Sequence, residues 1–186
     1  VTSIGSGAFS ECSNLKNITI PESVTSIGSS AFSKCRNLTN ITIPEGVTSI
    51  EDSTFWSCSS LTSIEIPESV ASIGRYAFRE CNNLKNITIP ESVTSIGMQA
   101  FSECRSLTNI TIPEGVTSIE DSTFWSCSSL TSIEIPESVA SIGSSAFKYC
   151  YSLTSITFNG TEEQFKAIKV GSGNDYFTKA TVTYTK

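Results

Sequence analysis

Proline and cysteine recur in this chain at a constant interval of twenty-three residues. A unit of this length is too short to bury a core alone, and a fixed period in the twenties is typical of solenoids, in which each coil packs only on its neighbours. The sequence therefore predicts about seven stacked coils. Every proline and every cysteine belongs to one of the two series: Pro21, Pro44, Pro67, Pro90, Pro113 and Pro136, and Cys12, Cys35, Cys58, Cys81, Cys104, Cys127 and Cys150.

A longer repeat is superimposed on the first. Residues 38–74 and 107–143 are identical, at an offset of three units. This identity indicates that the array grew by duplication of a block of three coils. Because each coil contacts only its neighbours, such a block can be inserted without creating a new kind of interface.

The hydrophobic pattern changes along one unit. The letters LTNITI (38–43) alternate between apolar and polar, which predicts a strand with one buried face. Pro44 cannot donate to a sheet and ends that strand. The next segment, VTSI (47–50), predicts a second short strand or an extended bend, whereas SSAFSKC (29–35) predicts a turn or 3₁₀ segment. The fold class that follows is a β-rich solenoid with columns of Leu, Ile, Val, Ala, Phe and Cys in its core.

The cysteine column has three alternative interpretations. Zinc sites need clustered cysteine or histidine ligands, and the chain has no CxxC motif and no histidine. Disulfides between stacked parallel neighbours have awkward geometry, and seven cysteines cannot all pair. We expect each cysteine to be a small buried residue that fills the same place in each coil.

The spacing of Leu, Pro, Phe and Cys in LTNITIPEGVTSIEDSTFWSC (38–58) and LTSIEIPESVASIGRYAFREC (61–81) resembles the BspA-like leucine-rich repeat of bacterial and protozoan surface proteins. The resemblance covers residues 1–158. It implies a leucine-rich-repeat right-handed superhelix, curved, with a parallel sheet on its concave face. It also implies a secreted or surface-exposed protein that binds host or neighbouring-cell molecules, but it transfers no individual site residue.

The period ends after Phe158, which predicts a solenoid over residues 1–158, truncated at its N-terminus, and a C-terminal cap over 159–186. A cap is needed because an open solenoid edge recruits other chains. The tail also resembles the closing segment of such arrays, with Phe165 where that segment usually has tryptophan.

Two elements are expected inside the cap. Thr161 with Gln164 three residues later matches a capping box, which predicts a helix near 161–168. Phe165 and Ile168 would face the last coil. The alternating letters ATVTY predict a strand near 180–184.

The charge balance argues against several classes of partner. Twelve Lys and Arg against eighteen Asp and Glu give a net charge of −6, which disfavours nucleic acid and anionic membrane surfaces. No apolar run approaches the roughly 18 residues of a membrane span. Serine without a histidine base is a poor nucleophile, so we expect no catalysis. We also expect no cofactor and no metal. The chain is expected to be monomeric.

The candidate binding residues are the outward residues of the predicted concave sheet. They are polar, short and nearly uncharged, which suits hydrogen bonding to a protein or glycan; alternatively, they are solvated strand residues selected for β-propensity. The face consists of Asn17, Thr19, Asn40, Thr42, Ser63, Glu65, Asn86, Thr88, Asn109, Thr111, Ser132 and Glu134, and continues at Ser155 and Thr157.

Trp56 and Trp125 form a second candidate site, expected on the convex surface. Exposed tryptophan is a frequent interface anchor and a stacking platform for sugars; the alternative is partial packing on a neighbouring coil. The acidic pairs that begin at Glu51 and Glu120 lack the six to eight oxygens of a calcium site. Arg75, Arg79 and Lys85 form a basic cluster that we interpret as a solvated patch.

Two functions remain open. The first is a cell-surface or secreted recognition module that acts in adhesion by binding a protein or glycan. The second is a passive spacer or stalk within a larger surface protein. A binder should have uneven chemistry on one face, whereas a spacer should have no preferred ligand.

Overall fold

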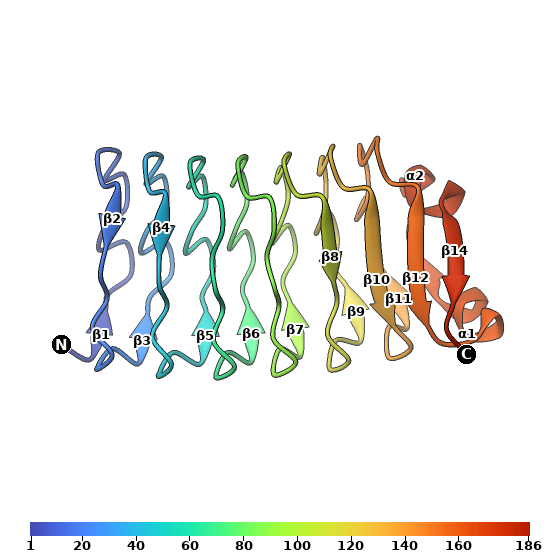
Figure 1. The fold of residues 1–186 in the computed structure, drawn as a ribbon, viewed down its shortest axis with the longest axis horizontal. Coiled ribbons are helices and arrows are strands. Elements are labelled where there is room, and N and C mark those ends of the chain that lie inside the picture. Colours follow the sequence, from blue (N-terminus) through green and yellow to red (C-terminus); the bar gives the residue numbers. More distant parts are fainter.

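The computed structural model describes residues 1–186 and shows one continuous stack of coils (Figure 1). The parallel β-solenoid predicted from the repeat is confirmed. Strands fall into two columns, which we call the long-strand column and the short-strand column. The long-strand column consists of β2 (Asn17–Ile18), β4 (Asn40–Ile41), β8 (Asn109–Thr111), β10 (Ser132–Pro136), β12 (Ser155–Asn159) and β14 (Thr181–Tyr184). The short-strand column consists of β1 (Ser3–Ile4), β3 (Ser26–Ile27), β5 (Ser49–Ile50), β6 (Ser72–Ile73), β7 (Ser95–Ile96), β9 (Ser118–Ile119), β11 (Ser141–Ile142) and β13 (Lys169–Val170).

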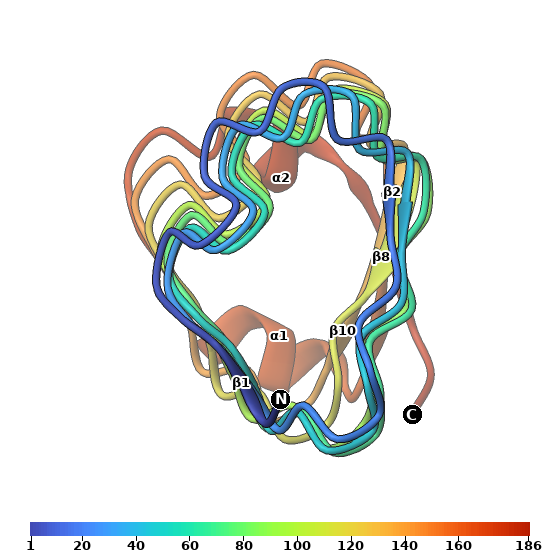
Figure 2. The same cartoon turned by 90° about the vertical axis from the view of Figure 1, so that its left-hand side faces the viewer.

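Within the repeats, strand pairing follows the sequence period without a slip; only β13 and β14, beyond the last repeat, pair at other offsets. All pairs are parallel, and Ser132 lies opposite Asn109 on one side and Ser155 on the other. Viewed along the stack, the coils superimpose as nested outlines, and α1 (Glu162–Ala167) and α2 (Asp175–Lys179) lie across the far end (Figure 2). Residues twenty-three apart therefore occupy equivalent places in successive coils.

The two identical segments do not form the same secondary structure. Residues 130–136 contain the five-residue strand β10, whereas the same letters at 61–67 form only isolated bridges at Glu65, to Thr42 and Thr88. The strand extent thus depends on the neighbouring coils, because a parallel strand is hydrogen-bonded to two partners.

A stack of phenylalanine rings runs through the core. Rings of neighbouring coils, from Phe9 to Phe147, lie 5.3–5.7 Å apart between centroids and nearly parallel. Phe177 of α2 continues the stack, 4.9 Å from Phe147. Since each buried ring contributes roughly 1.5–3 kcal/mol, this column is a large part of the stabilisation.

The cysteines occupy one buried column, as expected, and none forms a disulfide. Only Cys12, in the first coil, is exposed. The structure adds a hydrogen bond that the sequence did not suggest. Each buried thiol donates to the phenylalanine carbonyl oxygen of the preceding coil, as from Cys104 Sγ to Phe78 O at 3.1 Å. Burial raises the pKa of the Cys35 thiol to about 11 and that of Cys150 to about 12.

The segment that joins each short strand to the next long strand, which we call the turn column, is built of turns without a 3₁₀ helix. Two residues per coil have positive φ, as at Ser30 and Lys34, both with φ 59°. The recurrent glycine that follows most short strands has ordinary φ, which agrees with its replacement by Glu51 and Glu120 in two coils.

That glycine serves close approach between coils. A Cβ atom at Gly97 would lie 2.6 Å from the amide nitrogen of Arg75 in the preceding coil. The Gly97 amide also donates to Ile73 O at 2.8 Å, one coil earlier. The amides of Glu51 and Glu120 make no such bond, so adjacent backbones are less tightly joined at these two coils.

The C-terminal end contains the expected helix and strand and a second helix that was not predicted. Thr161 and Gln164 form the capping box that begins α1, and the Phe165 ring lies 5.2 Å from Phe158. The side chain of Asn174 takes the place of a further coil: its Oδ1 accepts from Phe147 N at 2.9 Å, and its Nδ2 donates to Gly143 O at 2.9 Å. Elsewhere the phenylalanine amide donates to the next coil, as from Phe124 N to Ala146 O at 2.9 Å.

Candidate binding surfaces

The residues proposed from the sequence lie together on the outer face of the long-strand column, which we call the long-strand face. Asparagine, threonine and serine side chains from Asn17 to Thr111 are exposed, and Ser132 and Glu134 are half-buried. The face has two shallow hollows of about 410 and 380 Å³, one between the first two coils and one centred on Glu65.

Hydrogen bonds order one end of this face. Glu134 Oε1 accepts from Asn159 Nδ2 at 2.9 Å, and Glu134 Oε2 accepts from Thr111 Oγ1 at 3.4 Å. These bonds join three neighbouring coils. Glu65, the equivalent residue in the other copy of the duplicated segment, makes no such side-chain bond, so the identical letters again differ in environment.

A row of glutamates borders the long-strand face. Each of the six prolines is followed by a glutamate, so the carboxylates line up along one corner of the stack: Glu22, Glu45, Glu68, Glu91, Glu114 and Glu137. Only Glu137 has an ion pair, with Lys186 Nζ at 2.8 Å. The hydrogen bond from Lys186, assisted by one from Gln164, lowers the pKa of the Glu137 carboxyl. The border of this face is consequently acidic.

The two tryptophans lie in the turn column and are half-buried. Lys34 Nζ lies 5.5 Å from the centre of the Trp56 ring, and the indole nitrogen of Trp56 is buried without a hydrogen-bond partner. Trp125 instead contacts Tyr149 edge to face at 5.6 Å and borders a hollow of about 310 Å³. The two sites therefore have different surroundings in spite of their identical local sequence.

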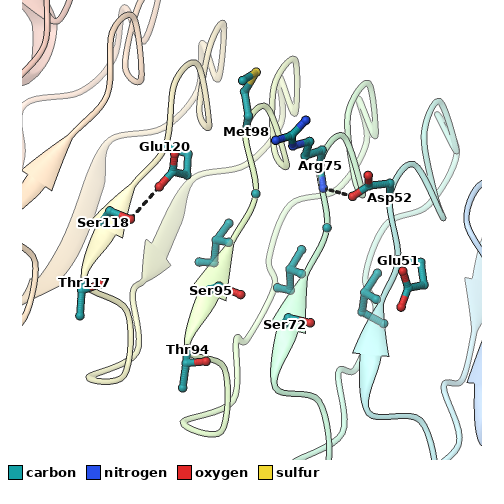
Figure 3. A pocket seen from close by; sticks show the side chains of 15 residues that line it. Glu51, Asp52, Ser72, Arg75, Thr94, Ser95, Met98, Thr117, Ser118 and Glu120 are labelled. Carbon is teal, nitrogen blue, oxygen red and sulfur yellow. Dashed lines mark hydrogen bonds between the residues drawn. The ribbon is translucent and has the colours of Figure 1, made fainter.

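A third surface, on the short-strand column, was missed by the sequence interpretation. It is a hollow of about 490 Å³ that extends over the four coils from Glu51 to Glu120. Figure 3 shows Glu51 at one end and Glu120 at the other, with Ser72 and Ser95 between them. The replacement of glycine by glutamate in two coils was the signal that could have indicated it.

The carboxylates of this hollow already have protein partners. Ser118 Oγ donates to Glu120 Oε1 at 2.7 Å, and the Arg75 amide donates to Asp52 Oδ1 at 2.7 Å (Figure 3). No group of three or more acidic, cysteine or histidine side chains is placed to hold a metal ion. The arrangement can hydrogen-bond a polar molecule through hydroxyl and carboxylate groups.

The profile of the BspA type leucine rich repeat region matches six copies, over residues 1–78 and 53–169. The chain belongs to this family. None of its helices has the length and apolar character needed to cross a membrane. Among curated proteins, no sequence is significantly similar to the chain.

Solved leucine-rich repeat proteins have the same fold. A leucine-rich repeat protein from T. pallidum is 34% identical, with a TM-score of 0.77 over 82% of this chain and 72% of that chain. One from Bacteroides ovatus is 30% identical, with a TM-score of 0.76 over 99% of this chain. This BspA-type chain spans 59% of the B. ovatus protein's length. The pneumococcal vaccine antigen PcpA, at 19% identity and a TM-score of 0.58, shares the fold alone.

Proposed function

We propose that the chain is a non-catalytic recognition module that binds a protein of a host or neighbouring cell through its long-strand face. The observation that supports this proposal is the register of the stack, which presents asparagine, threonine and serine side chains at equivalent positions on successive coils. Neighbouring strands in a sheet are about 4.8 Å apart, so the donors and acceptors form a regular grid. Short side chains also lose little conformational entropy when a ligand immobilises them.

The acidic border favours a ligand with a basic contact surface. Five of the six corner glutamates have no ion pair. Complementary charge accelerates association and excludes acidic competitors, and its effect weakens as salt increases. Binding of this kind should therefore be faster at low ionic strength.

Catalysis is not part of the proposal. The chain has no histidine, and its serines and threonines are repeated along columns rather than gathered around one base. Glu65 and Glu134 are separated by three coils, about 15 Å at the usual strand spacing, which exceeds the separation used by paired carboxylates in glycoside hydrolysis.

The proposed location is the cell surface or the extracellular medium, in a role in adhesion. The BspA type repeats support this location, because they resemble those of bacterial and protozoan surface proteins. Accessibility of the protein to antibody and protease on intact cells of the source organism tests the location.

Binding of the chain to immobilised extracellular-matrix proteins, measured by surface plasmon resonance, tests the function. Asn40→Arg and Asn109→Arg place a long cation on the second and fifth coils of the long-strand face, where both wild-type side chains are exposed. We expect each to weaken binding about tenfold or more, because a bulky charge prevents close contact. Asn83→Arg, at an exposed turn residue away from this face, is the matched control.

The alternative is a passive spacer, which the near-identity of the coils favours. A spacer predicts that no matrix protein binds, and that the three variants behave alike. Binding that survives both substitutions on the long-strand face would contradict its role as the contact surface.

A further inference from the structure

The duplicated segment contains two tryptophans whose surroundings differ because the coils on either side differ. Before Trp56 the neighbouring coil presents Lys34, whose ammonium group lies over the indole ring. Before Trp125 the equivalent residue is Glu103, and after it comes Tyr149. Only Trp125 therefore combines an adjacent hollow with an adjacent aromatic ring.

The hollow beside Trp125 is lined by Arg79, Gln99 and Ser122, and has a volume of about 310 Å³. Ser102 occupies the equivalent position in the coil between those of Arg79 and Trp125. Its hydroxyl is buried, with 1% of the residue exposed, and has no hydrogen-bond partner. Ser102 is therefore a small buried residue next to the hollow, whose lining side chains come from its neighbours.

The guanidinium group of Arg79 extends along the stack toward this space. Its Nη1 donates to Gln99 Oε1 at 3.2 Å, and its Nη2 donates to Glu103 Oε1 at 3.3 Å. Glu80 Oε1 lies 3.4 Å from Arg79 Nε. Glu80 and Glu103 therefore neutralise the Arg79 cation. The hydrogen bonds of Arg79 to Gln99 and Glu103 fix the orientation of its guanidinium group.

An aromatic strip continues from the hollow to the C-terminal end. Ring centroids are 5.6 Å apart for Trp125 and Tyr149, 5.9 Å for Tyr149 and Tyr151, and 5.4 Å for Tyr151 and Tyr176. Tyr149 is 37% exposed and Tyr151 is 60% exposed, and these are the two aromatic residues among the four most exposed large hydrophobic residues. Tyrosine presents an apolar ring together with a hydroxyl group that can bond to a polar ligand.

We propose that this hollow and strip, which we call the aromatic notch, bind a neutral oligosaccharide. The aromatic notch consists of Arg79, Gln99, Ser122, Trp125, Tyr149 and Tyr151. Sugar rings have apolar faces that stack on aromatic side chains, and their hydroxyl groups bond to planar amide, guanidinium and carboxylate groups.

Other ligand classes fit the aromatic notch less well. A peptide usually adds a strand to a sheet edge or places a helix in an apolar groove, and the turn column offers neither: it contains no strand, and Trp125 is the one hydrophobic residue that lines the hollow. An anion would find Arg79 already paired with Glu80 and Glu103. The inference is independent of the protein-binding proposal, because the turn column and the long-strand face are different sides of the coil (Figure 2).

The test uses the full chain and four neutral probes, the linear trisaccharides of glucose, mannose, galactose and N-acetylglucosamine, in isothermal titration calorimetry. We expect at least one to bind, and Trp125→Ala to raise its Kd about tenfold or more. Trp56→Ala, which removes the same residue from the identical sequence, is the matched control and should leave Kd within about twofold. Tyr151→Ala should raise Kd as well, and it should leave the fold intact because the Tyr151 side chain is 60% exposed.

A second variant adds a large side chain next to the hollow, between Arg79 and Trp125, without removing an aromatic ring. Ser102→Arg introduces a side chain that the same column already accommodates at Arg79, and circular dichroism establishes that the variant is folded. We expect it to abolish binding. The proposal is overturned if none of the four trisaccharides binds, if Trp56→Ala is as harmful as Trp125→Ala, if folded Ser102→Arg binds like the wild type, or if a sialylated trisaccharide binds more tightly than all four neutral ones.

Discussion

At the scale of single residues, the coil geometry places ordinary side chains where glycine is usually preferred, and glycine where φ is ordinary. Ser53 and Ser122 adopt φ values of 60° and 56°, in the left-handed region that costs an L-residue roughly 1–2 kcal/mol. Gly97, in contrast, is required by the proximity of Arg75 N in the preceding coil. The repeat therefore stores some backbone strain in every turn segment.

Ser53→Gly should stabilise the chain by about 0.5–1 kcal/mol, because relief of the left-handed strain exceeds the extra entropy of glycine in the unfolded state. Gly97→Ala should destabilise it by about 1–3 kcal/mol, since the new methyl group would overlap the adjacent backbone. Urea unfolding followed by tryptophan fluorescence measures both. Ser122→Gly, the equivalent change in the second copy, should match Ser53→Gly; a lower midpoint for both serine variants would contradict the strain argument.

At the scale of elements, the structure agrees with the sequence pattern where the residues of a single repeat unit determine the local structure. Alternation at 38–43, the proline that follows, and the capping box at Thr161 each depend on a few adjacent residues, and each has its expected counterpart in the structure. Strand length at 61–67 and 130–136 could not be predicted, because the letters are identical and only the neighbouring coils differ.

The candidate sites also differ in whether they could be predicted from one repeat unit. The long-strand face could be predicted because alternation determines which side of a strand faces outward. The hollow at Trp125 could not, because it combines Trp125 with Arg79 and Gln99 from preceding coils. Helix α2 was missed because its five residues are too few to show a helical period, and Phe177 is its only buried residue.

Asn174 is the side chain that connects α2 to the last coil, so its loss should open the C-terminal end. Asn174→Ala leaves Phe147 N and two carbonyl oxygens without partners and should cost about 1–3 kcal/mol. Because a solenoid is stabilised between nearest neighbours, the effect should be local. Hydrogen exchange should accelerate for amides of β12 and β14 and remain unchanged for those of β3 and β4. Equal acceleration along the whole stack would contradict this view, and exposed Asn83→Ala is the control.

At the scale of the whole molecule, columns of identical groups make small effects repeat along the stack. The thiol column shows this, because burial raises the pKa of Cys81, Cys104 and Cys127 well above the ordinary value of 9.0. Each of these thiols also donates to the backbone of the preceding coil, so the protonated form is the one that the folded state holds. Coil stacking and thiol protonation are therefore linked.

This linkage predicts alkaline unfolding. Above pH 9 the unfolded chain releases thiol protons that the folded chain retains, so the free energy of unfolding falls as pH rises. The slope is about 1.4 kcal/mol per pH unit for each buried thiol that unfolding exposes. The stabilisation that the protonated thiols provide is complete below pH 9. It is lost as pH rises toward the higher pKa of these thiols in the folded state. Urea unfolding under reducing conditions, from pH 7.5 to 10.5, measures the slope. The triple variant with Cys81→Ala, Cys104→Ala and Cys127→Ala should be less stable at pH 7.5 but should lose less stability per pH unit. Parallel pH profiles for wild type and variant would show that other groups cause the alkaline loss, because the three central thiols are the only titrating groups that the variant removes.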